Sequence, residues 1–175
     1  MVVDKAVADG LGLGIDVKNS QGVLVVNVGF DTTEVSILSL GGIVLSKLIK
    51  VGGRKFDDAI KAAVRREYSL IIGGKTAEVV KTSLLELEKA QTGAVVYGRD
   101  IVTGLPVERE IPTQLVDECL IEHFDTIIDN VKVILERTPP ELAADIYRHC
   151  VYLTGGASQV SKLAQLMSKG TGLKV

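Results

Sequence analysis

Short apolar runs alternate along the chain with amphipathic stretches. VLVVNV, at residues 23–28, is almost continuously apolar and short enough to predict a strand buried on both faces in the middle of a mixed sheet. TEVSILSL and IVLSKLIKV follow it, and the Gly41–Gly42 pair between them predicts a two-residue β-hairpin connection. Before these strands, residues 1–13 predict a short helix that frays into a glycine-containing loop.

The next stretch changes to helical periodicity. FDDAIKAAVRREY, at 56–68, places apolar residues on one helical face and Lys61, Arg65 and Arg66 on the other. TAEVVKTSLLELEKA, at 76–90, predicts a second helix. GAVVYGRDIVTGLPVEREI, at 93–111, predicts a strand, a Gly/Pro turn and a returning strand.

A long amphipathic helix is predicted over 113–137, up to the point where Pro139 and Pro140 end it and begin a further short helix. Its apolar stripe is expected near Leu115, Cys119, Ile127, Val131 and Leu135. CVYLTGG then predicts a buried strand, and ASQVSKLAQLMSKG predicts a helix that stops at a glycine.

These elements predict an α/β fold with a mixed sheet flanked by helices. Because the helical and hairpin segment interrupts that framework, we expect a core lobe of residues 1–52 and 111–175 and an inserted smaller subdomain of residues 53–110.

The composition and the cysteine and histidine positions argue against several classes of function. The 175 residues are 46% hydrophobic and carry a formal charge of −2, which is typical of a globular protein and offers no field for nucleic acid. Cys119 and Cys150 lack ligand spacing, so they predict neither a metal site nor a disulfide, and they fit a reducing cytoplasm. No signal peptide or bilayer-spanning run is present, so membrane contact would require a partner or a further segment. His123 and His149 have no nucleophile at a recognisable spacing, which favours structural roles.

Two glycine turns are candidates for anion binding. NVGFDTTE, at 27–34, lies between two predicted strands, and its Gly29, Thr32 and Thr33 would offer backbone approach and hydroxyl donors to a phosphate. LTGGAS, at 153–158, places Gly155 and Gly156 at a predicted helix start. Taken alone, the first segment is better explained as a plain β-turn, and the second as ordinary strand–helix punctuation.

A third candidate is the pair Glu78 and Lys81, which lie three residues apart and therefore on one helical face. They could bracket a ribose and base. The alternative is an exposed ion pair of little energetic value.

Taken together, these segments resemble the MreB-type bacterial actins, within the wider superfamily of actin, Hsp70 and sugar kinases. The resemblance runs from about Lys5 to Val175. It is carried by residues 25–53, the helix with TAEVVK, and VYLTGGAS, and the discriminating stretches are GRDIVTGLP and ERTPPELAADI.

The resemblance implies an ATP-binding cleft between two lobes, of which this chain supplies the one called domain II. The turn over 27–33 would be the second phosphate loop, Glu78 and Lys81 would lie beside the nucleoside, and Gly155, Gly156 and Ala157 would belong to the adenosine loop. ATP with Mg²⁺ is the implied cofactor. The family's first phosphate loop and catalytic acidic residue are expected upstream of this chain, and a closing strand and helix after Val175.

The second phosphate loop departs from the family pattern of an aspartate, an apolar residue, three glycines and a threonine. Asn27 replaces the aspartate, and an amide oxygen is a weaker ligand for a hard cation. Phe30 and Asp31 replace two glycines, and a carboxylate 4 Å from a phosphate is opposed by roughly 4 kcal/mol at an effective dielectric of 20. A bridging Mg²⁺ would reverse that sign. We therefore expect weak nucleotide binding or slow hydrolysis.

Other departures follow. Arg54 and Lys55 stand where the family usually has acidic residues. Their side chains would either be solvated or contact a phosphate. Ala157 replaces a third glycine in the adenosine loop.

The function implied is cytoskeletal. The intact protein would polymerise with ATP into filaments that direct rod shape and wall synthesis, at the inner face of the membrane through an adaptor such as RodZ, and the isolated chain would have no ATPase activity. Two alternatives stay open: an enzyme or chaperone of the same superfamily, and an interaction module that has lost nucleotide.

Overall fold

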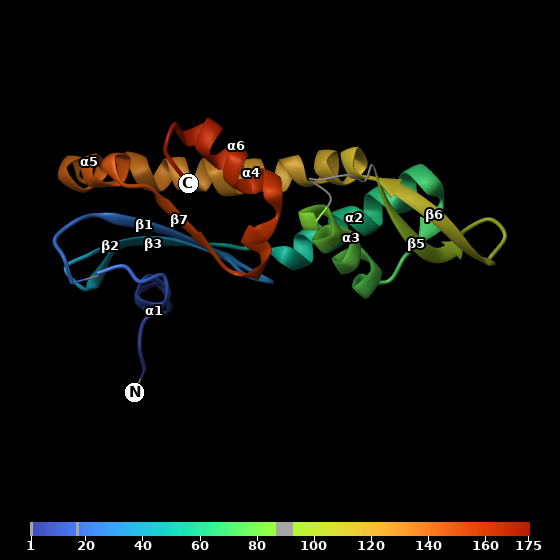
Figure 1. Ribbon diagram of the computed structural model, residues 1–175, viewed down its shortest axis with the longest axis horizontal. Coiled ribbons are helices and arrows are strands. Elements are labelled where there is room, and N and C mark those ends of the chain that lie inside the picture. The colour runs from blue at the N-terminus through green and yellow to red at the C-terminus, as the bar shows by residue number, and fades with distance from the viewer. Residues whose placement is uncertain (1, 17, 87–92) are drawn as a thin grey trace. The chain divides into compact units, whose positions relative to one another are not determined.

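The computed structural model describes residues 2–16, 18–86 and 93–175, which form two compact units (Figure 1). The first unit comprises Met1–Gly53, Phe124–Gln159 and Leu163–Val175, and the second comprises Arg54–His123 and Val160–Lys162. The predicted α/β class with a mixed sheet is confirmed. The division into a core lobe and an inserted subdomain of residues 53–110 stays a prediction. The second unit covers nearly all of that range and continues into the following helix.

A four-stranded mixed sheet forms the centre of the first unit. Its strand order is β3 (Gly42–Ile49), β2 (Thr33–Ser39), β1 (Val23–Val28) and β7 (Val151–Thr154). β1 pairs antiparallel with β2 and parallel with β7, and β2 pairs antiparallel with β3. Residues 24–28 are all buried, which confirms the predicted central strand. β7 was expected to be buried throughout, but only Val151 is, because in the described sheet β7 has just one neighbouring strand.

Helices cover both faces of this sheet. In Figure 1, α1 (Lys5–Gly12) lies on one side of it, and α5 (Pro140–Arg148), α6 (Ser161–Thr171) and the second half of α4 (Thr113–Glu136) lie on the other. Ala6 of α1 packs with Val25 and Leu38 of the sheet. Burial on both faces explains why β1 is apolar throughout and does not alternate with polar residues.

Three local predictions were wrong in detail. The β2–β3 connection is Leu40–Gly41, because Ser39 pairs with Gly42, which already belongs to β3. Leu40 and Gly41 have φ of 51° and 78°, the left-handed pair that a tight hairpin requires.

The second error concerns the C-terminal helix predicted over 157–170. It is divided into a 3-10 turn, η2 (Gly156–Gln159), and α6. The Gly155 carbonyl accepts bonds from both the Ser158 amide (3.1 Å) and its hydroxyl (2.6 Å), which tightens this turn. α6 passes through Gly170 and ends at Thr171, before Gly172 at φ 71°.

The third error is the apolar stripe of α4. Ile127 and Val131 are buried as expected, but Leu115, Cys119 and Leu135 are only half-buried. The buried residues of α4 lie on one face, at steps of three and four residues, and are Val116, Leu120, Phe124, Ile127, Ile128, Val131 and Ile134.

The second unit combines helices with an antiparallel sheet. α2 (Gly53–Tyr68) buries Phe56, Ile60, Ala63 and Val64, which confirms its predicted apolar face. The sheet has the order β4 (Leu70–Ile71), β5 (Gly93–Asp100) and β6 (Pro106–Pro112), in which the predicted hairpin is confirmed and the two-residue β4 was not foreseen. α3 (Gly74–Glu86) is the second predicted helix. Residues 87–90 of that prediction lie outside the described residues.

Both discriminating sequence stretches have a structural explanation. In GRDIVTGLP, Asp100 Oδ1 accepts bonds from the amide (2.7 Å) and hydroxyl (3.1 Å) of Thr103 and from the amide of Val102 (2.9 Å), and these bonds hold the pKa of Asp100 below its usual range. In ERTPPELAADI, the buried Thr138 donates its hydroxyl hydrogen to the Ile134 carbonyl, and Pro140 begins α5. Asp145 Oδ2 accepts the Gly22 amide at 3.0 Å, so α5 holds the segment that enters β1.

Burial protects one thiol from modification. Cys119 donates to the Val116 carbonyl, and burial raises the pKa of its thiol from 9.0 to about 11. At pH 8 the thiolate population is then roughly a hundredfold smaller than for an unhindered cysteine. In a Cys150→Ser variant we expect iodoacetamide to label Cys119 roughly a hundredfold more slowly in the folded chain than in guanidinium. Equal rates would contradict this burial. The same shift destabilises the fold only once the pH rises above about 9.

Candidate functional site

Two parallel strands of the first unit end side by side, and each runs into a glycine turn. Asn27 of β1 lies opposite Thr154 of β7. Gly29 follows one strand, and Gly155 follows the other. In open α/β sheets, ligands bind outside the carboxyl ends of parallel strands, because loops diverge there and leave backbone amides accessible. The structure therefore brings together two of the three predicted turns, Gly29 and Gly155, within one unit.

Gly155 is the residue that lets the two turns meet. Its φ is 92°, which L side chains rarely adopt. A Cβ placed on it would stand 2.7 Å from the Val28 carbonyl carbon and closer still to the carbonyl oxygen. Only glycine can approach the end of β1 this closely. Gly156 and the buried Ala157 follow in η2, so the predicted adenosine-loop residues form a compact turn against β1.

The first turn is closed by its own backbone. The Gly29 amide donates to the Thr32 carbonyl at 2.9 Å, and the Gly29 carbonyl accepts the Gly53 amide at 3.0 Å. A Cβ on Gly52 would stand 2.6 Å from the Gly29 oxygen and 2.7 Å from the Phe30 oxygen. Gly52 was not singled out from the sequence, although its position beside a second glycine is the signal that points to a close backbone approach.

The side chains of this turn differ in their surroundings. Thr33 is fully buried, and its hydroxyl donates to the Val51 carbonyl at 2.8 Å. Thr32 is half-buried. Phe30 is 56% exposed, and Asp31 is exposed as well. Thr33 therefore shapes the turn from inside, whereas Phe30 and Asp31 are exposed and Thr32 is half-buried.

A carboxylate not recognised in the sequence contacts Asn27, two residues before Gly29. Asn27 is 8% exposed and donates its side-chain amide to Asp9 Oδ2 of α1 at 2.7 Å. The ammonium of Lys5 lies 3.8 Å from the same oxygen and 3.5 Å from Glu34 Oε2. Asp9 and Asn27 are 18 residues apart, so local periodicity gives no signal of their contact.

Glu78 and Lys81 belong to α3, in the second unit. Glu78 is exposed, whereas Lys81 is buried and donates to Asp57 Oδ1 of α2 at 2.7 Å. The side chains of Lys81 and Asp57 are only 9% and 10% exposed. The sequence alternative of a solvent-exposed Glu78–Lys81 pair is therefore wrong for Lys81, and Asp57 is a partner that the sequence did not indicate.

Arg54 and Lys55, the basic pair at the start of α2, are both exposed. They contribute to a pKa for Asp58 below its usual range, behind the larger effect of the Lys61 hydrogen bond.

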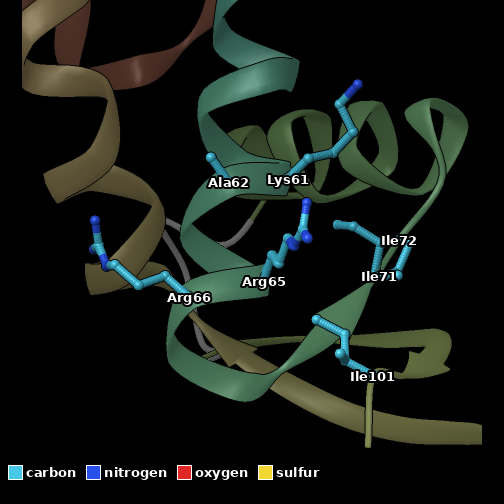
Figure 2. A pocket seen from close by; sticks show the side chains of 7 residues that line it. All are labelled: Lys61, Ala62, Arg65, Arg66, Ile71, Ile72 and Ile101. Carbon is cyan, nitrogen blue, oxygen red and sulfur yellow. The ribbon is translucent and has the colours of Figure 1, made fainter. Parts of the chain in front are cut away.

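A pocket of about 680 Å³ lies elsewhere in the second unit (Figure 2). Its lining consists of Lys61, Ala62, Arg65, Arg66, Ile71, Ile72 and Ile101. In Figure 2 the side chain of Arg65 extends from α2 toward Ile71 and Ile72, while Arg66 points away from them. Lys61 and Arg66 are paired with Asp58 and Glu67, both at 2.7 Å. None of the residues predicted to bind nucleotide lines this pocket.

Two features are absent from the described residues, a membrane-spanning helix and a metal-binding cluster. Over 2–16, 18–86 and 93–175, no helix is long and apolar enough to cross a bilayer. Over the same ranges, no group of three or more histidine, cysteine or acidic side chains is placed to hold a metal ion.

Comparison with known proteins places these features in a context. A sequence model of the MreB/Mbl protein family matches residues 1–175. The cell shape-determining protein Mbl of Bacillus subtilis is 38% identical over 161 residues, covering 91% of this chain and 48% of that protein. The cell shape-determining protein MreB of Escherichia coli is 36% identical over 179 aligned positions, covering 99% and 51%.

Solved structures agree with these relatives. Crystal structures of MreB5 of Spiroplasma citri, bound to AMPPNP and to ADP, superpose with TM-scores of 0.92 and 0.94 at 39% and 38% identity. Each match covers 99% of this chain and 53% of the solved chain. The chain thus spans about half the length of the proteins it matches.

Proposed function

The chain belongs to the MreB/Mbl family, and from this premise we propose that it is one lobe of an actin-like, ATP-binding cytoskeletal protein. In this proposal the chain is domain II, with 1–52 and 111–175 as its core and 53–110 as its inserted subdomain. The opposing lobe contributes the remaining wall of the nucleotide cleft. Alone, the chain has no ATPase activity because it lacks that wall.

One observation carries the proposal: the glycine turns after β1 and β7 meet at the carboxyl ends of two parallel strands. The Gly155 backbone packs directly on the end of β1 at Val28, and Gly52 packs on the backbone of Gly29 and Phe30, and each approach is close enough to exclude a Cβ. Glycine turns of this kind let an anionic ligand approach main-chain amides. The two S. citri MreB5 structures hold AMPPNP and ADP, which supports a nucleotide as that ligand.

The residues present fit the group in part. Thr32 would hold a phosphate oxygen. Gly29, whose own amide bonds the Thr32 carbonyl, and Thr33 would shape the turn around the phosphate. Gly155, Gly156 and Ala157 would lie against the adenosine. Glu78, exposed on α3, and Lys81, whose ammonium is bonded to Asp57, are the nucleoside contacts proposed in the second unit. Mg²⁺ would neutralise phosphate charge when bound, and Asn27, where the family has a carboxylate, would offer it an amide oxygen.

Filament formation and its cellular role follow from the family. The complete protein would assemble with ATP into filaments of its own copies and direct rod shape and wall synthesis. It would act at the inner face of the membrane through an adaptor such as RodZ, without inserting into the bilayer itself. Its relatives Mbl and MreB are named as cell shape-determining proteins, which supports this role.

An interaction module with weakened nucleotide binding is the second candidate, and Phe30 and Asp31 favour it. Both side chains are exposed on the turn where the family carries glycines. A carboxylate there repels a phosphate, although solvent at an exposed site screens much of that repulsion.

These two functions predict different effects of restoring the glycines. In the complete two-lobed protein, we expect Phe30→Gly combined with Asp31→Gly to tighten ATP binding about tenfold, equivalent to about 1.4 kcal/mol. Titration with a fluorescent ATP analogue measures this, and Asp31→Asn separates the charge from the bulk of the side chains. Electron microscopy of the same samples should show filaments only with ATP. Filaments or partner binding that ignore nucleotide, together with no measurable ATP affinity in either form, would favour the interaction module.

A further inference from the structure

We propose that Asp9 is a positioning residue of the nucleotide site, which orients the amide of Asn27 and supplies the negative charge that residue 27 lacks. This inference rests on the nucleotide-binding function proposed above. The starting observation is the 2.7 Å hydrogen bond from Asn27 Nδ2 to Asp9 Oδ2, made two residues before Gly29.

The chemistry of the two groups fixes which way the amide faces. An ionised carboxylate only accepts hydrogen bonds, so the nitrogen of Asn27 must face Asp9. The amide oxygen then lies on the other side of the side chain, and it is 3.9 Å from the point where a Cβ on Gly29 would stand. Because Asn27 is 8% exposed, this arrangement is held by its surroundings. The oxygen is therefore presented toward the turn.

The same bond also changes the strength of the oxygen. Donating to a carboxylate polarises the amide and raises the electron density on its carbonyl oxygen, which improves it as a ligand for a hydrated cation. The charge of Asp9 lies directly behind it. Together, Asp9 and Asn27 carry one negative charge, as a single aspartate at position 27 would.

A purely structural role is the competing explanation. Asp9 also lies 3.8 Å from the Lys5 ammonium, which in turn lies 3.5 Å from Glu34, and this chain of charges joins α1 to β2. In that case Asp9 would serve only to dock α1 on the sheet. The two explanations make different predictions for the Mg²⁺ dependence of nucleotide affinity. If Asp9 acts on the nucleotide site, removing its charge while keeping the hydrogen bond changes that dependence, whereas a purely structural role leaves it unchanged.

The test uses Asp9→Asn, Asn27→Asp and the exchange of both residues. In the 175-residue chain, Asn27→Asp places two carboxylates at hydrogen-bond distance, so we expect the melting midpoint to fall by several degrees at pH 8 and to recover near pH 4. The exchange variant keeps one carboxylate and one amide, and its midpoint should return to within about two degrees of the unaltered chain. If the exchange does not restore stability, the two residues are not coupled as described and the proposal is overturned.

The second arm measures ATP affinity of the complete two-lobed protein with Mg²⁺ and with EDTA. Asp9→Asn should reduce the gain in affinity that Mg²⁺ provides at least fivefold, and the exchange variant should recover that gain. Asp4→Asn is the control, because it removes a negative charge at the start of the same helix from a side chain that makes no capping bond.

The outcomes separate the two levels of the proposal. No binding of ATP to the unaltered two-lobed protein would overturn the nucleotide function and the role of Asp9 with it. Binding whose Mg²⁺ dependence is the same in Asp9→Asn and in the unaltered protein would overturn only the role of Asp9. A loss shared equally by Asp4→Asn would reduce the effect to general electrostatics and would also contradict it.

Discussion

Gly155→Ala should destabilise the first unit by about 3–5 kcal/mol, a large part of the stability of an ordinary domain. Two costs add. A non-glycine residue in the left-handed region costs about 1–2 kcal/mol. The new Cβ must also push against the Val28 backbone, whose carbonyl carbon would be 2.7 Å away, and backbone in the middle of a sheet cannot move aside as a flexible side chain can. Urea denaturation of the 175-residue chain, followed by circular dichroism, measures the loss.

The neighbouring glycine gives the matched control. A Cβ on Gly156 would meet nothing within 4 Å, and its φ is not in the left-handed range. Gly156→Ala should therefore change the free energy of unfolding by no more than about 0.5 kcal/mol. If both substitutions cost the same, the close approach of Gly155 to β1 is not what holds this turn, and the observation behind the proposed site is lost.

Most of the fold could be predicted from the sequence because its signals are local. VLVVNV is short and apolar throughout, and that pattern alone indicates a central strand. The adjacent prolines Pro139 and Pro140 indicate the end of one helix and the start of the next. The errors arose where the local signal was ambiguous. Two adjacent glycines at 41 and 42 do not indicate which of them lies in the turn. In the structure Ser39 pairs with Gly42, so the turn consists of Leu40 and Gly41.

The candidate site could be predicted less completely, since its parts meet only in three dimensions. The glycine turns were visible in the sequence, but each alone is also explained by an ordinary turn, and only the resemblance to a family joined them into one site. Asp9 and Asp57 were not, because their partners lie 18 and 24 residues away and no periodicity connects them. Resemblance to a family identifies residues that match the family's pattern. Asn27 departs from that pattern, so its partner Asp9 could not be identified in this way.

Replacing Lys81 by methionine should cost the second unit about 3–5 kcal/mol, because it leaves the carboxylate of Asp57 buried without its cation. Removing both charges should cost far less, so Lys81→Met combined with Asp57→Leu is expected to recover most of the loss. Lys61→Met is the control: the Lys61–Asp58 pair has the same 2.7 Å separation, but its side chains are 37% and 53% exposed, so the change should cost less than about 1 kcal/mol. Thermal and urea denaturation of the four chains decide this. Equal losses for Lys81→Met and Lys61→Met would mean that burial of the Lys81 pair has no energetic weight.

The Lys81–Asp57 pair also bears on the proposed nucleotide contact. Because Asp57 already neutralises Lys81, this lysine brings little net charge to a phosphate. Glu78 is exposed on the same helix and is therefore the better residue for testing contact with the nucleoside.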